Sequence, residues 1–532
     1  MGETLTESYC PATDGPPIRD LTVGGLLREA AADTPHTTAL VAGMPEPSER
    51  RRWTYGELLA ESERVARALL ARFEPGERVA VWAPNVPEWV MLEFGCGLAG
   101  VVLVTVNPAF QAQEVDYVLR QSGASGVITM PEFRGNPMLA TATELQAELP
   151  ALREVISLGE WGEFLAAADP GRDLPEVDPR AAAQIQYTSG TTGFPKGAVL
   201  HHRGIVNNAR DIIERNHPEP GTGYVNPMPL FHTGGCVIGV LGCAWRRMTH
   251  VLVLAFDPAL VLELIETERA SCMVGVPTML IAMIEHPDFE TRDLSSVQVV
   301  TSGGSTVPEP LVRRIEGALG VDFTIVYGQT ECSPVATMTR PEDSVEDKAL
   351  TLGQALPSIE SKIVDPATGE VVPIGDIGEF CTRGYHVMLG YHEAPDATVE
   401  AIDADGWLHT GDLCAMDERG YSTIEGRLKD MIIRGGENIY PREIEDLLFA
   451  RDDIGEVAVV GLPDDTWGEI VGAFIRPTPG AEPSEADLRA YCREHLAPHK
   501  TPARWFFVED FPLTGSGKIQ KFKLAQDAVA SD

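Results

Sequence analysis

One eleven-residue segment concentrates groups that bind anions. It runs from Tyr187 to Gly197 and reads YTSGTTGFPKG, with four Ser or Thr hydroxyls, three glycines and one of only eight lysines in the chain. Glycines let backbone N–H groups approach an anion, hydroxyls donate hydrogen bonds, and Lys196 adds positive charge. The segment is not a P-loop, because Lys196 lies between Pro195 and Gly197. A plain surface loop is the alternative, but this density of donors favours phosphate binding.

Two further segments contain a carboxylate that could bind a ligand. The first, Tyr327–Glu331, reads YGQTE, and the second, Gly406–Leu413, reads GWLHTGDL and contains Asp412. Magnesium takes one or two carboxylates together with phosphate oxygens, which makes Glu331 a candidate metal ligand. A carboxylate such as Asp412 can accept hydrogen bonds from two neighbouring sugar hydroxyls. A solvated glutamate and an aspartate in a plain turn are the alternatives.

Four more motifs combine glycine with one functional side chain. The motifs are PLFHTGG with His232, SGGS with Gly303, Gly304 and Ser305, RGGEN with Gly435 and Gly436, and PLTGSGK with Lys518. Glycines leave room for a flat or narrow ligand to approach the backbone. Each motif also has a structural interpretation: a hydrogen-bonded core histidine, a tight turn, a hairpin and a flexible basic tail, respectively.

The sequence GCGLAG at Gly95–Gly100 matches the dinucleotide-binding fingerprint letter for letter. That fingerprint needs a strand before it and a helix after it. Here the predicted helix Glu88–Ala99 comes first and the predicted strand Val101–Val106 follows. The reversed order favours close packing of helices over NAD binding.

Predicted helices and strands alternate along most of the chain. The clearest are the helices Glu57–Phe73, Glu88–Ala99, Ala259–Glu268 and Leu311–Leu319, and the strands Arg78–Trp82, Val101–Val106, Gln184–Tyr187, Ala270–Val276 and Val297–Val300. Such alternation indicates parallel sheets covered by helices. The region Gly353–Tyr421 is rich in Gly and Asp and indicates antiparallel β structure.

After Arg427 the pattern changes to a compact α+β unit of about 100 residues. Its predicted elements are the helices Arg442–Ala450 and Glu485–His495 and the strands Val457–Val460, Gly472–Arg476 and Trp505–Val508. We place a domain boundary near Arg427–Asp430.

Composition excludes some classes of function. The chain has 532 residues and a formal net charge of −37, which argues against nucleic-acid binding and against docking on anionic membranes. Its longest uncharged apolar runs are shorter than the roughly 20 residues needed to span a bilayer. Nine cysteines without a Cys-x-x-Cys pair indicate reduced thiols in a cytoplasmic protein.

Taken in order, these motifs resemble the adenylate-forming superfamily of acyl-CoA synthetases, adenylation domains and luciferases. Within it, the chain looks most like medium- and long-chain fatty acyl-CoA ligases. The resemblance implies an α/β fold with a large N-terminal domain of two helix-covered sheets plus a distorted β-barrel. It also implies a small mobile α+β C-terminal domain. The expected domains are residues 1–428, which bind ATP and the acyl group, and residues 429–532, which carry the catalytic lysine.

The resemblance assigns roles to residues in both domains. In the large domain, the expected phosphate-binding residues are Thr188, Ser189, Gly190, Thr191, Thr192 and Lys196. Gly303, Gly304 and Ser305 would line the adenine pocket, and His232 would flank the acyl and thiol channel. In the segment Tyr327, Gly328, Gln329, Thr330 and Glu331, the tyrosine would stack on adenine, the threonine would contact the α-phosphate and the glutamate would bind magnesium.

The remaining roles fall near the domain boundary and beyond it. Asp412 and Arg427 would contact the ribose, and Lys429 would be the hinge. Gly435 and Gly436 would line the pantetheine tunnel. Lys518 would be the catalytic lysine.

The implied reaction is the ATP- and Mg²⁺-dependent activation of a carboxylic acid as its acyl adenylate, followed by acyl transfer to coenzyme A. A fatty acid is the expected substrate, and the resemblance leaves a homodimer open. Alternatives with the same fold activate an aryl acid or nitrite, or use a carrier-protein thiol or an amine as acceptor. A non-catalytic nucleotide-binding protein would be expected to lack Lys518, Glu331 or Asp412, and all three are present.

Overall fold

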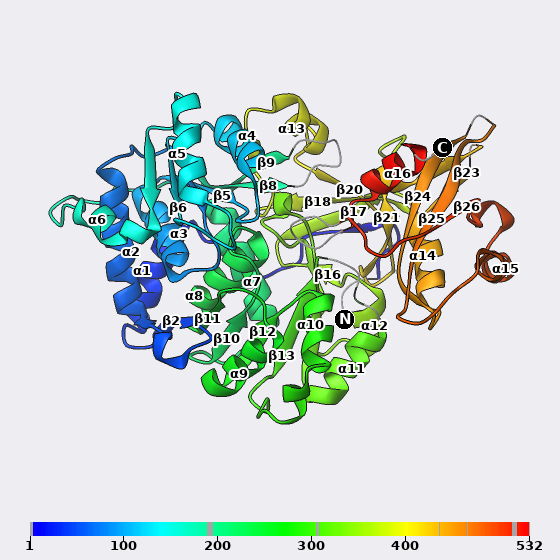
Figure 1. Cartoon of the computed structure of the whole chain (residues 1–532), viewed down its shortest axis with the longest axis horizontal. Coiled ribbons are helices and arrows are strands. Elements are labelled where there is room, and N and C mark those ends of the chain that lie inside the picture. Colours follow the sequence, from blue (N-terminus) through cyan, green and yellow to red (C-terminus); the bar gives the residue numbers. More distant parts are fainter. Residues whose placement is uncertain are drawn as a thin grey trace. The chain divides into compact units, whose positions relative to one another are not determined.

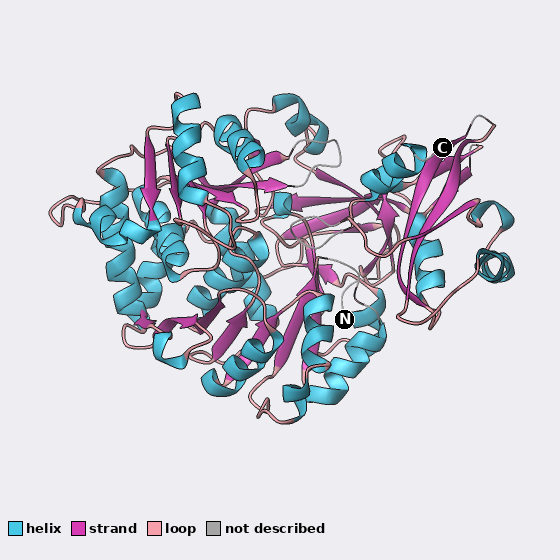
Figure 2. Cartoon of the chain, in the orientation of Figure 1, coloured by secondary structure: helices cyan, strands magenta, loops and turns pink. Residues whose placement is uncertain are grey.

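The computed structural model describes residues 4–188, 195–304, 307, 309–435, 437–464, 466–512 and 519–530. Its internal contacts divide the chain into two compact units. The larger unit comprises Cys10–Ser361 and Thr382–Leu408, and the smaller unit comprises Met1–Tyr9, Lys362–Cys381 and His409–Asp532. Figure 1 colours the chain along its sequence, and Figure 2 distinguishes its helices from its strands.

Within the described part of the larger unit, nine strands form one sheet in the order β16-β15-β14-β13-β12-β10-β11-β2-β3. The six neighbouring strands from β14 to β2 run parallel, whereas β15, β16 and β3 pair antiparallel at the edges. The strands are β2 (Thr38–Gly43), β3 (Arg52–Thr54), β10 (Gly223–Asn226), β11 (Thr249–Val253), β12 (Ala270–Val274), β13 (Val299–Gly303), β14 (Asp322–Tyr327), β15 (Thr337–Met338) and β16 (Gln354–Ala355).

A second sheet of the larger unit contains seven strands among the described residues, in the order β19-β9-β8-β5-β4-β6-β7. Strands β8, β5, β4, β6 and β7 run parallel, and β9 and β19 continue the sheet in antiparallel pairs. Its strands are β4 (Arg78–Trp82), β5 (Val102–Val106), β6 (Gly126–Thr129), β7 (Glu154–Ser157), β8 (Ala182–Thr188), β9 (Lys196–His201) and β19 (Gly390–Tyr391).

Helices flank these sheets, as Figure 2 shows. They are α1 (Val23–Asp33), α2 (Tyr55–Leu70), α3 (Pro87–Ala99), α4 (Ala112–Ser122), α5 (Met138–Glu148), α6 (Trp161–Ala166), α7 (His202–Arg215), α8 (Gly242–Arg246), α9 (Pro258–Glu268), α10 (Pro277–Ile284), α11 (Glu309–Leu319), α12 (Val345–Leu350) and α13 (Pro395–Ala401). Shorter helical turns are η1 (Pro47–Glu49), η2 (Leu158–Glu160), η4 (Pro287–Glu290) and η5 (Thr330–Cys332), and η3 (Gly234–Leu241) is a π-helix.

One core of the larger unit lies between its nine-stranded sheet and the helices α9 and α11. Fully buried side chains of the sheet, such as Val251 and Phe323, pack with Leu262 of α9 and Val312 of α11. Burying each such side chain stabilises the fold by roughly 1.5–3 kcal/mol. A second core, between the seven-stranded sheet and the helices α4 and α5, includes Val104.

The glycines of the fingerprint-like segment lie in a helix-packing contact. Gly95 and Gly97 lie within α3, and Gly100 ends that helix with a φ of 69°. A Cβ atom at Gly95 would lie 2.5 Å from the Val65 side chain of α2, and one at Gly97 would lie 2.9 Å from the Gly24 nitrogen of α1. The prediction of close helix packing is confirmed.

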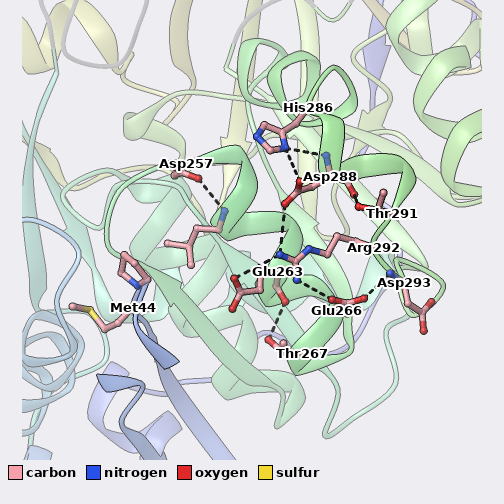
Figure 3. Close-up of polar contacts among 12 residues, drawn as sticks. Met44, Asp257, Glu263, Glu266, Thr267, His286, Asp288, Thr291, Arg292 and Asp293 are labelled. Atoms are coloured by element: carbon pink, nitrogen blue, oxygen red, sulfur yellow. Dashed lines mark hydrogen bonds and ion pairs between the residues drawn. The ribbon is translucent and has the colours of Figure 1, made fainter. Parts of the chain in front are cut away.

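An ion-pair cluster joins α9 to η4 and to the residues after η4 (Figure 3). The guanidinium of Arg292 lies 3.0 Å from Glu266, 3.5 Å from Asp288 and 3.7 Å from Glu263. Glu263 also lies 2.6 Å from Arg50, whose Nε donates to the Met44 carbonyl. We refer to Arg50, Glu263, Glu266, Asp288 and Arg292 as the ion-pair cluster. It ties α9 to residues that are distant in the sequence.

The smaller unit contains most of a five-stranded sheet with the order β1-β17-β18-β20-β21 among the described residues. These strands are β1 (Tyr9–Cys10), β17 (Ile359–Val364), β18 (Gly378–Gly384), β20 (Leu408–Met416) and β21 (Ser422–Arg427). Strands β20 and β21 are antiparallel. The bridges between Val364 and Val371 and between Ile402 and Leu408 are antiparallel too, in agreement with the antiparallel β structure predicted for Gly353–Tyr421.

The C-terminal part of the smaller unit forms its own α+β layer. In its described residues, the sheet has the order β23-β22-β25-β24, and β26 pairs with β25. Its elements are η6 (Leu428–Asp430), β22 (Ile432–Arg434), β23 (Glu437–Ile439), α14 (Pro441–Phe449), β24 (Ile454–Asp464), β25 (Gly468–Pro477), α15 (Glu485–His495), η7 (Pro498–Lys500), β26 (Arg504–Phe507) and α16 (Lys521–Ala530). Ile444 of α14 and Leu488 of α15 pack on Val459 and Ile475 of the sheet.

The α/β fold predicted from the alternating pattern is confirmed. No helix within the described ranges combines the length and the apolar character needed to cross a membrane.

Candidate active site

Strands β8 and β9 flank the glycine-rich phosphate-binding candidate. Thr188, the last residue of β8, is the register partner of Lys196, the first residue of β9, and its hydroxyl donates to the Lys196 carbonyl over 3.4 Å. The hydroxyl of Tyr117 on α4 donates to the Pro195 carbonyl over 2.8 Å. The two ends of the segment are therefore held side by side. Ser189, Gly190, Thr191 and Thr192 lie outside the described residues.

The loop with His232 is fixed by a buried amide that the sequence did not reveal. Asn85 is 7% exposed, and its side-chain nitrogen donates to the carbonyls of Met228 and Val253, each at 3.0 Å. Its oxygen accepts from the Leu230 nitrogen at 2.8 Å. The Gly234 nitrogen donates to His232 Nδ1 at 3.1 Å, so Nδ1 is the unprotonated ring nitrogen.

The π-helix η3 follows His232 and consists of the buried apolar sequence GGCVIGVL. Next to η3 lies a buried polar group: Glu93 accepts from Gln184 at 2.7 Å, and Gln186 donates to the Cys236 sulfur at 3.2 Å. Burial raises the pKa of Glu93 well above its ordinary value, because the charged form of the carboxyl group loses its contact with water.

The carboxyl ends of the parallel strands β13 and β14 lie next to each other and carry two of the predicted motifs. Gly303 pairs with Val326, one residue before Tyr327. A Cβ atom at Gly303 would lie 2.4 Å from the Val326 carbonyl oxygen, and one at Gly328 would lie 2.1 Å from the Pro334 carbonyl oxygen. Glycine is therefore required at both positions by backbone packing. Gly304 has a φ of 77° and open space beside it. Ser305 lies outside the described residues.

Thr330 and Glu331 lie in the short turn η5, directly after Gln329. Glu331 is 7% exposed, and its Oε1 accepts a hydrogen bond of 2.7 Å from the hydroxyl of Tyr391. The ammonium of Lys196 lies 5.0 Å from the centre of the Tyr391 ring. We refer to Lys196, Glu331 and Tyr391 as the Tyr391 cluster. The sequence analysis identified the first two residues but not the third.

In the smaller unit, Asp412 and Arg427 are register partners on β20 and β21. Arg427 Nε lies 3.0 Å from Asp412 Oδ1, and the Asp412 side chain is 3% exposed whereas that of Arg427 is 46% exposed. The carboxylate is thus held in place within the sheet, while the guanidinium reaches solvent. This arrangement offers both an acceptor and a donor to a sugar hydroxyl pair.

The turn before Asp412 is held by Glu379 of β18. Glu379 Oε1 accepts from the Gly411 nitrogen at 2.9 Å, and Oε2 lies 2.8 Å from His409 Nδ1. With Cys381, whose sulfur lies 3.4 Å from the same ring nitrogen, these residues could hold a metal ion. Both oxygens of Glu379 already have partners in the protein, so a structural role in positioning Asp412 accounts for the group.

The remaining predicted residues lie in the C-terminal part of the smaller unit. Lys429 is exposed on η6. Gly435 forms the turn between β22 and β23 with a φ of 60°, and these strands pair antiparallel, which confirms the hairpin interpretation. Gly436 and Lys518 lie outside the described residues.

The sequence matches two families. Residues 27–392 match the family described as AMP-binding enzyme, and residues 443–518 match the AMP-binding enzyme C-terminal domain. YngI of Bacillus subtilis (strain 168), provisionally named an acyl-CoA synthetase, is 42% identical over 96% of this chain and 97% of its own length. The human mitochondrial medium-chain acyl-CoA ligase ACSF2 is 36% identical over 98% of this chain and 89% of its own length.

Comparison with solved structures also indicates similarity to this family. The ATP-bound MatB from Rhodopseudomonas palustris is similar with a TM-score of 0.87 and 29% identity, over 96% of this chain and 99% of that chain. The resemblance inferred from the motifs is confirmed: the chain belongs to the AMP-binding enzyme family.

Proposed function

We propose that the protein activates a fatty acid as its acyl adenylate and transfers the acyl group to coenzyme A. Family membership and the identity of 36% and 42% to acyl-CoA ligases and synthetases carry this proposal. At the coarser level, the chain is an AMP-forming acid–CoA ligase that uses ATP, Mg²⁺ and coenzyme A.

The reaction has two steps. In the first, a carboxylate oxygen of the acid bonds to the α-phosphorus of ATP, the bond from that phosphorus to the bridging oxygen breaks, and pyrophosphate leaves. In the second, the sulfur of coenzyme A bonds to the acyl carbon, the bond to AMP breaks, and the thiol proton is released. The first step brings two anions together, so the protein must supply positive charge and hold the groups in line.

Residues of the larger unit fit the nucleotide and its metal ion. In this proposal, Thr188, Lys196 and the intervening Ser189, Gly190, Thr191 and Thr192 bind the β- and γ-phosphates. Tyr327 stacks on adenine, Thr330 contacts the α-phosphate, and Glu331 binds magnesium, which would neutralise phosphate charge. Among the described residues, no cation lies within ion-pair distance of the buried Glu331 carboxylate. A buried carboxylate is costly without a cation, so this site suits a divalent ion.

Residues of the smaller unit complete the proposed machinery. Asp412 and Arg427 contact the ribose, supported by their pairing across β20 and β21. Lys518 donates positive charge in the first step, residues 429–532 form the mobile domain, and Lys429 is its hinge. Gly435 and Gly436 line the pantetheine tunnel. These roles come from the match of motifs to the family.

The identity of the substrate as a fatty acid is the more specific part of the proposal. It is supported by the name of the medium-chain ligase ACSF2 and by the apolar π-helix η3 that follows His232. Aryl acids, nitrite, carrier-protein thiols and amines are the competing substrates and acceptors.

An exchange assay tests substrate and acceptor. We expect a fatty acid to support ATP–pyrophosphate exchange, and added coenzyme A to convert it to an acyl-CoA. The panel should contain fatty acids of graded length, aryl acids and nitrite, each with and without coenzyme A. Exchange with nitrite or an aryl acid alone would overturn the fatty-acid proposal, and acyl adenylate that does not react with coenzyme A would overturn the acceptor.

Lys518→Ala tests the catalytic lysine. We expect adenylate formation to fall by about 10²–10³, the usual loss on removing one preorganised donor of charge. Thioester formation from acyl adenylate supplied ready-made should be spared, because the family resemblance places this lysine away from the site in the second step. The neighbouring Lys523→Ala is the matched control and should leave both steps unchanged. An equal loss in both steps for Lys518→Ala would contradict the assignment.

We further propose a cytoplasmic location, supported by nine free cysteines, eight of them buried. The homodimer stays a prediction, which sedimentation of the purified protein would test.

A further inference from the structure

We propose that Tyr391 is a positioning residue that holds Lys196 and Glu331 apart and orients both toward the nucleotide and its metal ion. This inference rests on the proposed function, because it takes these two residues as the phosphate-binding ammonium and the magnesium ligand. Tyr391 belongs to none of the motifs that carry the family resemblance. Three observations within the larger unit support this positioning role of Tyr391.

The first observation is the strand register that places the Tyr391 ring against Lys196. Strand β19 pairs antiparallel with β9, with Tyr391 opposite Ala198 and Gly390 opposite Val199. Backbone hydrogen bonds on both sides hold this pairing: the Leu389 nitrogen donates to Val199 and the His392 nitrogen donates to Gly197. Residues two apart on a strand share one face, so Lys196 is the diagonal neighbour of Tyr391. The contact of 5.0 Å between ammonium and ring centre follows from this register.

The second observation is the local structure that fixes β19 itself. Gly390 has a φ of 141°, and a Cβ atom there would lie 2.7 Å from the Thr398 side chain of α13. The Thr398 hydroxyl oxygen accepts from the Tyr391 nitrogen at 2.9 Å. Glycine at 390 and threonine at 398 therefore allow a close approach that fixes the backbone of Tyr391. The Tyr391 side chain therefore extends from a fixed backbone.

The third observation is the contact of the same side chain with the acidic turn. The Tyr391 hydroxyl donates to Glu331 Oε1 at 2.7 Å, and the Met388 nitrogen donates to the Glu331 carbonyl at 2.9 Å. One segment, Met388–Tyr391, thus contacts Glu331 through both backbone and side chain. Since the hydroxyl occupies one oxygen from a fixed direction, the other oxygen has a defined orientation.

Together these contacts separate two opposite charges. Across the described residues, no ion pair within 4.0 Å joins Lys196 to Glu331, and the Tyr391 side chain contacts both. A direct pair would neutralise the charge that each needs for phosphate or metal. The neutral ring and hydroxyl give each charged group a favourable contact without cancelling its charge. Tyr391 therefore acts through Lys196 and Glu331 and does not itself react.

Two variants separate the hydroxyl from the ring. Tyr391→Phe keeps the ring beside Lys196 and removes the hydrogen bond to Glu331, and Tyr391→Leu removes both. The matched control is Tyr491→Phe: Tyr491 on α15 also has a cation, Arg451, 5.0 Å from its ring centre, but it belongs to none of the proposed site motifs.

Binding of Mn²⁺, a spectroscopic substitute for Mg²⁺, is measured by electron paramagnetic resonance with the non-cleavable analogue α,β-methylene-ATP. For Tyr391→Phe we expect the Mn²⁺ dissociation constant to rise about tenfold, the effect of losing a hydrogen bond to a charged group. The Mg²⁺ concentration for half-maximal pyrophosphate release should rise in parallel, and high Mg²⁺ should restore most of kcat. Tyr391→Leu should additionally weaken binding of the analogue itself.

Unchanged Mn²⁺ binding in Tyr391→Phe would overturn the inference. A lower kcat with an unchanged Mg²⁺ concentration for half-maximal pyrophosphate release would also overturn it, because this result indicates only a packing defect. An equal shift in Tyr491→Phe would also overturn it. If the wild-type chain released no pyrophosphate with any acid, the proposed function would fail, while the Mn²⁺ measurement would still report on Tyr391.

Discussion

Two groups of charged side chains in the larger unit balance their charges in different ways. In the ion-pair cluster, Arg292 lies within 4 Å of three carboxylates, and Arg50 lies 2.6 Å from one of them. In the Tyr391 cluster, the ammonium and the carboxylate each contact the same tyrosine. The first group satisfies its charges internally, which suits a structural role. In the second group the cation and the anion are not paired with each other, which suits the ligand-binding role that we propose.

The carboxylates of the two groups differ in exposure as well. The side chains of Glu263 and Arg292 are each 26% exposed, so water screens their attraction. Glu331 is 7% exposed, and its environment strengthens electrostatic interactions with a bound ion. Under the proposed function, the same type of residue therefore contributes little to stability in one place and much to catalysis in another.

The largest expected difference between the two groups comes from the same substitution in each. Glu331→Gln keeps the size of the side chain and removes its charge, so we expect pyrophosphate release at fixed Mg²⁺ to fall by about 10²–10³. Glu263→Gln, the matched control in the ion-pair cluster, should leave the rate nearly unchanged, because Glu263 belongs to none of the proposed site motifs. Steady-state kinetics of both variants measure this. Similar losses in the two would remove the distinction.

Much of the fold could be predicted from local sequence pattern. Strand β4 and helix α15 have the predicted bounds, Arg78–Trp82 and Glu485–His495, and α3 differs by one residue. Local signals delimit each of them: β4 is a short apolar run, Pro87 begins α3, and the Ser484 side chain caps α15. Strand β24, Ile454–Asp464, is much longer than the predicted Val457–Val460. Its outer residues pair with β25, and tertiary pairing of this kind leaves little trace in local sequence.

The π-helix η3 could not be predicted for a related reason. Its sequence, GGCVIGVL, is apolar on all sides and contains three glycines, so it shows neither the 3.6-residue nor the two-residue period. Burial on all sides, rather than propensity, stabilises it.

The residues of the candidate site likewise fall into those that local sequence identifies and those that it does not. Motifs identified the residues that would touch ligand, such as Lys196, Glu331 and Asp412. The residues that hold them, Asn85 and Tyr391, act across long sequence separations. Tyr391 contacts Glu331 from 60 residues away, and Asn85 binds Met228 from 143 residues away. Spacing along the chain contains no signal for such partners.

A smaller effect is expected from Arg292→Ala, which removes the cation shared by three carboxylates. We expect the unfolding free energy to fall by roughly 1 kcal/mol or less, because exposed ion pairs contribute little and the remaining acids repel one another only weakly in water. Urea denaturation of the variant beside the wild type measures the change. Pyrophosphate release should be unaffected. A loss of activity as large as that of Glu331→Gln would mean that this cluster, too, serves the reaction.

The smallest expected effect is the pH dependence of the ion-pair cluster. The backbone N–H of Asp293 and the guanidinium of Arg292 lower the pKa of Glu266 below its ordinary value of 4.5. A carboxylate with a lowered pKa in the folded state stabilises the fold above its ordinary pKa, and this contribution disappears as pH falls through the lowered value. The wild type should therefore unfold at a slightly higher temperature than Glu266→Gln at pH 7, and the difference should shrink below pH 4.5. Calorimetry across this range measures it, with the exposed Glu163→Gln as the matched control that should show no such trend. A difference that grew toward acidic pH would mean that Glu266 is held in its neutral form, and the cluster would then not be a set of balanced ion pairs.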